Sequence, residues 1–121
     1  MSTPSGNLPA APTLPLTPAL RAAYQDLYDK LEAQYEATHD TTVRLALEPA
    51  KDNVDDLLTK DNICQLQSDT AAFEALAGQI GSTNDGLKTL QGQIASTASH
   101  FAMAGDILGA VNKVFGLLGM V

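Results

Sequence analysis

The chain has 121 residues, of which 45% are hydrophobic and 17% charged, and its formal net charge at pH 7 is −7. This balance is too apolar for a wholly disordered chain and is typical of a globular protein. The net negative charge would repel a polyanionic nucleic acid, and no cluster of Lys and Arg offsets it locally. We therefore expect a folded protein that does not bind nucleic acid.

Aromatic residues make up only 5% of the chain and Trp is absent, so the core must consist mainly of Leu, Ile, Val and Ala. Such aliphatic cores suit packed helices, whereas β-sandwiches favour β-branched and aromatic residues at alternating positions. No segment alternates apolar and polar residues over the length of a strand. The sequence predicts an all-α fold.

The sequence does not determine the cellular location of the protein. Cys64 is the single cysteine, which excludes an intramolecular disulfide. The N-terminal residues lack the basic and apolar regions of a cleavable signal peptide, and no run of 18 uncharged apolar residues predicts a transmembrane helix. Both a cytoplasmic location and export without a signal peptide fit these observations.

Proline is concentrated at the start of the chain, where five of the six prolines precede residue 19. Proline at this density disfavours helix and sheet, so residues 1–17 are predicted to form a flexible tail. The P-x-x-P spacing from Pro9 to Pro18 also occurs in ligands of SH3-like domains, but the nearest basic residue, Arg21, falls inside the next helix. We expect a tail, followed by one helical domain over residues 18–121.

The first helix has a clear predicted start. Thr17 is placed to cap it, and Pro18 suits its first position because the missing amide hydrogen would be unsatisfied there. Apolar residues then recur at three- and four-residue steps, with a weak stretch at residues 37–42. Pro49 is expected to kink the following segment or to start a new helix after Glu48.

Three predicted breaks divide the helical region into segments of about twenty residues, within the usual range of helix lengths. They lie near residues 40, 60 and 82, and the second is a turn at residues 60–62 in which Asp61 or Asn62 caps the next helix. Two arrangements fit this spacing. One is an antiparallel helical hairpin of long helices, and the other is a four- or five-helix bundle.

A seven-residue repeat dominates the second half of the chain. Two apolar positions per heptad are typical of a coiled-coil seam or of a long helix in a left-handed bundle. The seam residues are Leu66, Phe73, Leu76, Ile80, Leu87, Leu90, Ile94, Phe101, Leu108, Val111, Phe115 and Leu118. Gly78, Gly81 and the polar stretch 82–86 weaken a helix here, so two or three shorter helices compete with one continuous helix. We favour the continuous helix.

Three groups of residues have the spacing of functional sites, but each has a simpler interpretation. Glu36 and His39 have the E-x-x-H spacing of di-metal bundles, which need that motif twice. The acidic run 52–56 lacks the glycine and closing glutamate of a calcium loop and suits a helix N-terminus after Pro49. Cys64 is expected to be a buried small hydrophobic residue. We expect no catalytic residues, no metal and no cofactor.

The segment 101–121 gives the strongest functional indication. Its charged residues are only Asp106 and Lys113, and its glycines are spaced so that two helix backbones could approach closely. The leading hypothesis is a non-enzymatic interaction or assembly protein whose low-charge heptad face in residues 66–118 binds itself or another helical protein. Two alternatives stay open. One is an exported protein whose C-terminal amphipathic helix binds a membrane surface, and the other is a helical bundle that binds a lipid or apolar ligand.

Overall fold

The computed structural model describes residues 15–119, and all regular structure within them is helical. The predicted all-α class is confirmed. The elements are α1 (Pro18–Ala37), α2 (Thr41–Gln67), α3 (Thr70–Ser96), the short 3₁₀ helix η2 (Ala98–His100) and α4 (Ala104–Leu117). Most of the predicted flexible tail, residues 1–14, lies outside the described residues.

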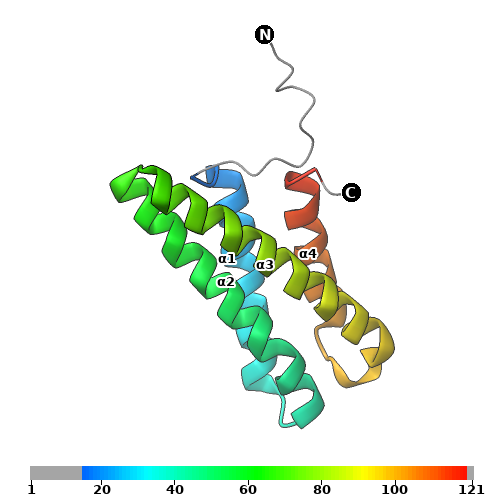
Figure 1. The fold of residues 1–121 in the computed structure, drawn as a ribbon. Helices are drawn as coiled ribbons and strands as arrows, with labels where there is room; N and C mark the ends of the chain where they lie inside the picture. The colour runs from blue at the N-terminus through cyan, green and yellow to red at the C-terminus, as the bar shows by residue number, and fades with distance from the viewer. Residues whose placement is uncertain (1–14, 120–121) are drawn as a thin grey trace.

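The longest helices, α2 and α3, form an antiparallel pair with the most extensive contact in the molecule (Figure 1). Helix α1 packs against α2 and also against α4, and α1 and α4 run in opposite directions (Figure 1). One cluster of buried side chains, mostly Leu, Ile, Val and Ala, draws on all four α-helices. The aliphatic core expected from the composition is therefore present.

Local capping explains where α1 and α2 begin. The Thr17 hydroxyl accepts a hydrogen bond from the Leu20 amide at 3.2 Å, and Pro18 occupies the first turn, as predicted. Asp40 caps α2 by accepting hydrogen bonds from the amides of Thr42 and Val43. Both side chains satisfy amides that have no partner inside the helix. Since α1 ends at Ala37 and α2 begins at Thr41, the predicted break near residue 40 is confirmed.

The predicted turn at residues 60–62 is wrong, because α2 continues to Gln67. Asp61 is buried inside α2, where its carboxylate accepts hydrogen bonds from the Leu16 amide at 2.7 Å and from the Gln65 side chain. The turn falls instead at Ser68, which has a left-handed backbone (φ 51°). Asp69 then caps α3 through the Ala72 amide at 2.8 Å.

A new helix after Glu48 is also absent from the structure, because α2 runs through Pro49. Proline cannot donate to the carbonyl four residues earlier, which here belongs to Leu45. Pro49 lies on the exposed side of α2, where water can satisfy that carbonyl. The acidic run 52–56 consequently lies in the middle of α2 and not at a helix N-terminus as expected.

The predicted break near residue 82 is absent, because α3 is continuous from Thr70 to Ser96 and residues 78–86 are helical. The continuous helix favoured over this stretch is therefore confirmed there. Two of its polar residues point inward and bind neighbouring helices. The Tyr24 hydroxyl donates to Asn84 Oδ1 at 3.0 Å, and the Thr83 hydroxyl donates to the Asn53 carbonyl at 3.0 Å. Thr83 and Asn84, two of the residues that disfavour a helix locally, thus bind α3 to α2 and α1.

The connector between α3 and α4 forms hydrogen bonds with the turn between α1 and α2 and with the last part of α1. His100 Nδ1 lies 2.7 Å from Asp40 Oδ2, and the Met103 amide donates to Oε1 of the buried Gln34 at 2.6 Å. The predicted seam is therefore not carried by one helix, because the turn at residues 68–69 and the connector at residues 97–103 interrupt it.

Candidate interaction surfaces

The predicted seam residues differ in how far they are exposed to solvent. Phe73 and Leu108 are partly buried against the core, and Leu66 is 86% exposed. The other nine are buried, namely Leu76, Ile80, Leu87, Leu90, Ile94, Phe101, Val111, Phe115 and Leu118. Most of the predicted interaction face is thus occupied within the chain itself, and a partner could reach only its margins.

The exposed side of α4 carries three glycines, together with one acidic, one basic, one amide and one large apolar residue: Gly105, Gly109 and Gly116, with Asp106, Lys113, Asn112 and Leu117. The inward side of the helix supplies Ile107, Ala110, Val111, Val114 and Phe115 to the core. On the exposed side, a Cβ atom added to Gly105 or Gly109 would meet, within 4 Å, no atom of residues 15–119 other than the nearby backbone of α4 itself. Packing within the chain therefore does not require glycine at these two positions.

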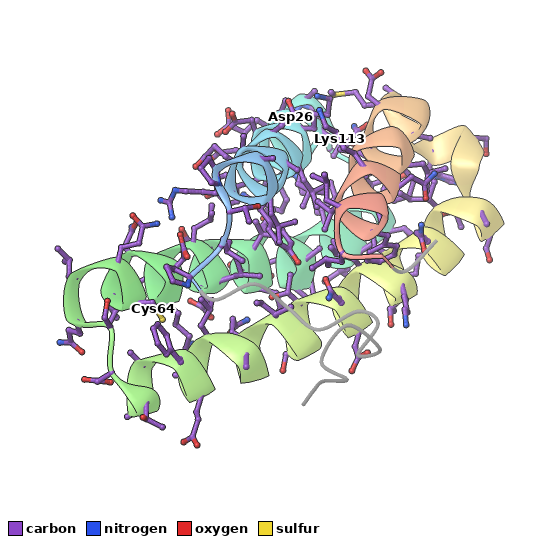
Figure 2. All side chains as sticks on the ribbon, turned by 90° about the horizontal axis from the view of Figure 1, so that it is seen from above. Asp26, Cys64 and Lys113 are labelled. Carbon is purple, nitrogen blue, oxygen red and sulfur yellow. The ribbon has the colours of Figure 1, made fainter. Side chains whose placement is uncertain are left out.

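Two charged residues flank this glycine face. Asp106 and Lys113 are seven residues apart, which places them on the same side of α4 about two turns from each other. Figure 2 shows Lys113 on the part of α4 that borders α1, on the same side of the molecule as Asp26. Asp26 is paired with Lys30 at 2.7 Å, and no ion pair among residues 15–119 includes Asp106 or Lys113. The two charges of the α4 face cancel in a chain whose net charge is −7.

A second exposed surface lies along α2 and was missed from the sequence. It carries the exposed residues Leu45, Glu48, Asp52, Asp55, Asp56, Ile63 and Leu66, and we call it the α2 outer face. The buried stripe of α2 drew attention to Val43, Leu47 and Val54, whereas Leu45 and Ile63 are out of phase with that stripe. Apolar residues on the acidic side of an amphipathic helix were the signal that could have revealed this surface.

A pocket of about 320 Å³ opens between the start of α2 and the end of α3. Its lining consists of Thr42, Ala46, Thr89, Gly92, Gln93, Ser96 and Thr97. The hydroxyls of Thr89, Ser96 and Thr97 donate to carbonyls of α3 four residues earlier. Their remaining hydrogen-bonding capacity is therefore mainly that of acceptors.

The candidate metal and thiol residues are not brought together. Glu36 and His39 are both exposed near the end of α1, and the described residues contain no group of three or more His, Cys, Asp or Glu side chains that could hold a metal ion. Cys64 is buried between α2 and α3, and its thiol donates to the Ala72 carbonyl at 3.1 Å (Figure 2). Burial raises the pKa of the Cys64 thiol, and the charges of Asp61 and Asp69 raise it further.

None of the helices in residues 15–119 is long and apolar enough to cross a membrane. No family model matches the chain. No curated protein and no solved structure matches it either.

Proposed function

We propose that the chain is a non-enzymatic assembly protein that pairs with a second copy through the outward face of α4. In this proposal the four helices act as one bundle whose core holds most of the seam residues. The contact itself uses the opposite side of the C-terminal helix, where Gly105, Gly109 and Gly116 lie. The observation that carries the proposal is that Gly105 and Gly109 lie four residues apart on the exposed side of one helix and both have open space at their Cβ positions. The glycines of α3 with open Cβ positions, Gly78, Gly81 and Gly92, do not have this four-residue spacing.

Glycine inside a helix lowers its stability by about 0.8–1 kcal/mol relative to alanine. Among residues 15–119, no side chain packs closely on Gly105 or Gly109 to offset that loss. Glycines four residues apart allow two helix backbones to approach more closely than larger side chains permit. A helix from another molecule is therefore a physical reason for glycine at both positions.

The charges of α4 support pairing between two copies in an antiparallel arrangement. A two-fold axis at right angles to the helix, passing near Gly109, places Asp106 of one copy opposite Lys113 of the other, and the reverse. Each copy then supplies one positive and one negative charge, so the contact is self-complementary. Two copies that met through more acidic surfaces would repel each other.

Reciprocal charge reversal tests this arrangement. Asp106→Lys alone, or Lys113→Asp alone, places like charges opposite each other and should shift the protein to monomers in size-exclusion chromatography with light scattering. A mixture of the two variants should form dimers again, because each variant then carries the charges that complement the other. The double variant Asp106→Lys/Lys113→Asp should also dimerise.

The mixing experiment separates contacts between copies from contacts within one copy. Helix α4 packs against α1, so a single reversal could also weaken that packing within the same chain. Such damage would persist in the mixture, whereas a contact between copies is restored. Failure of the mixture to dimerise, or a wild-type protein that is monomeric at about 100 µM, where even a weak contact with a micromolar Kd is populated, would refute the proposal.

A further inference from the structure

The exposed apolar residues of the α2 outer face lie on the same side of the helix. Of the four large exposed hydrophobic side chains in the described chain, three lie on it: Leu45, Ile63 and Leu66, with exposed fractions of 66%, 40% and 86%. Leu45 and Ile63 are 18 residues apart, about five turns, so they project in the same direction. Leu66 follows one turn later. Exposed leucine and isoleucine aligned along one helix mark a contact surface more strongly than scattered ones.

Four acidic residues lie on this face between Leu45 at one end and Ile63 and Leu66 at the other. Glu48, Asp52, Asp55 and Asp56 are all exposed, and no ion pair among residues 15–119 includes them. The basic residues of α2 are directed elsewhere. Arg44 and Lys51 lie 4.9 and 4.3 Å from the centroid of the Tyr35 ring, and Lys60 donates to the Gln79 side chain at 2.9 Å. Ion pairs within residues 15–119 therefore do not neutralise the negative charge of this face.

The negative potential extends from α2 onto the neighbouring part of α1. Burial is the main cause of the raised pKa of Tyr28, and Glu32, Asp55, Asp52 and Asp29 raise it further. Glu32 and Asp29 belong to α1, and Asp52 and Asp55 to α2, so acidic residues of both helices act on the same ring. An incoming positive charge would be attracted along the whole length of this surface.

We infer that the α2 outer face binds a basic amphipathic helix of a partner protein. Its apolar residues would contact Leu45 at one end and Ile63 and Leu66 at the other, and its Lys and Arg residues would lie over the carboxylates between them. The span from Leu45 to Leu66 is about 31 Å at 1.5 Å per residue, the length of a helix of some twenty residues. Nucleic acids and anionic membranes carry the wrong charge for this surface.

A second copy of the chain does not fit this surface. Each copy has a net charge of −7, and no described part of it is a basic helix with apolar ends. The surface also lies on a different helix from the one proposed to mediate dimerisation. The inference is therefore independent of the proposed function, and a dimer would present two such faces.

Fluorescence anisotropy with a labelled synthetic peptide tests the inference on the full chain. The probe is a 20-residue amphipathic helix of Leu and Lys, and the reference probe replaces every Lys by Glu. The Leu/Lys peptide should bind at about 150 mM salt, where the Debye length is about 8 Å, and the Leu/Glu peptide should not. The pair Asp52→Asn/Asp56→Asn and the pair Ile63→Ser/Leu66→Ser should each weaken binding about ten-fold. These side chains are exposed, so the fold should tolerate both pairs.

A matched pair on α3 controls for general attraction between a basic peptide and an acidic protein. Glu74→Gln/Asp85→Asn removes the same charge from exposed positions and should change the affinity less than about two-fold, as expected of screened charges remote from the contact. Equal losses for the two acidic pairs, or no loss for Ile63→Ser/Leu66→Ser, would overturn the inference. Asp106→Lys should retain peptide binding, which distinguishes failure of this surface from failure of the α4 dimer.

Discussion

Asp61 of α2 and Arg21 of α1 form an ion pair in which the carboxylate is completely buried while the guanidinium group is one-third exposed. The same carboxylate accepts the Leu16 amide and the Gln65 side chain. Asp61 therefore holds the start of α1, and the residues just before it, against the far end of α2. Leu16 itself is buried, so the packed part of the chain begins before the first helix.

We expect Arg21→Met to lower the free energy of unfolding by about 2 kcal/mol, because it leaves a buried carboxylate without its counter-ion. The value is below that of a fully buried pair, since solvent reaches Arg21. Urea unfolding followed by circular dichroism measures it. Lys30→Met, which breaks the exposed pair with Asp26, is the control and should change stability by less than about 0.5 kcal/mol. Equal effects of the two substitutions would contradict the role of Asp61.

Gly109→Ala should stabilise the isolated chain and weaken its self-association. At a concentration too low for dimers, we expect the free energy of unfolding to rise by about 0.5–1 kcal/mol, because alanine favours the helix and its Cβ meets open space. The dissociation constant of the dimer, measured by analytical ultracentrifugation, should rise. Gly86→Ala provides the comparison, since its Cβ would lie 2.8 Å from Asn53 Nδ2 and the gain in stability should be smaller. Stabilisation of Gly109→Ala with unchanged dimerisation would argue against the α4 contact.

Acid should weaken the interaction between Asp40, in the turn between α1 and α2, and His100, in the connector between α3 and α4. The hydrogen bond with His100 holds the pKa of Asp40 below its ordinary value, and the Val43 amide lowers it further. Since the folded-state pKa is the lower one, Asp40 stabilises the fold above its unfolded pKa, and this contribution disappears as the pH falls through the folded pKa. Asp40→Asn should therefore be less stable than wild type in urea unfolding at pH 6. At about pH 2.5 the difference should have diminished. A difference that is constant between the two pH values would contradict this account.

Tyr24→Phe removes the buried hydroxyl that donates to Asn84 Oδ1. We expect a loss of about 1–2 kcal/mol in the free energy of unfolding, because a buried acceptor loses one of its donors. The same substitution at Tyr28, whose ring is only partly buried and for which no hydrogen bond is observed in residues 15–119, should cost less than about 0.5 kcal/mol. Thermal and urea unfolding of both variants measure the contrast.

Elements governed by short-range chemistry could be predicted from the sequence. The Thr17–Pro18 start of α1 and the break before α2 depend on side chains that bind amides two or three residues away. The turn expected at residues 60–62 failed because the partners of Asp61 come from the beginning of the chain, 40 and 45 residues earlier. The continuity of α3 through residues 82–86 likewise depends on Tyr24 and Asn53, which local propensity does not include.

The candidate surfaces were harder to predict than the helices. Seven-residue periodicity shows that Leu87 and Ile94 avoid water, but it does not show whether the apolar contact comes from the same chain or from another. In the structure both are buried by the chain itself. The α2 outer face escaped notice because Leu45 and Ile63 are far apart in sequence, and their alignment becomes evident only once α2 is known to be a single helix through Pro49 and Asp61.

The antiparallel packing of α1 against α4 brings the start of the first helix and the end of the last one to the same end of the molecule (Figure 1). The two ends could therefore be joined and the chain opened at another connection between helices. A circularly permuted protein, opened between Ser68 and Asp69 and closed through the existing terminal residues, would keep every helix intact. In such a chain α3 and α4 would be synthesised before α1 and α2, and the helices should still reach the same packed arrangement.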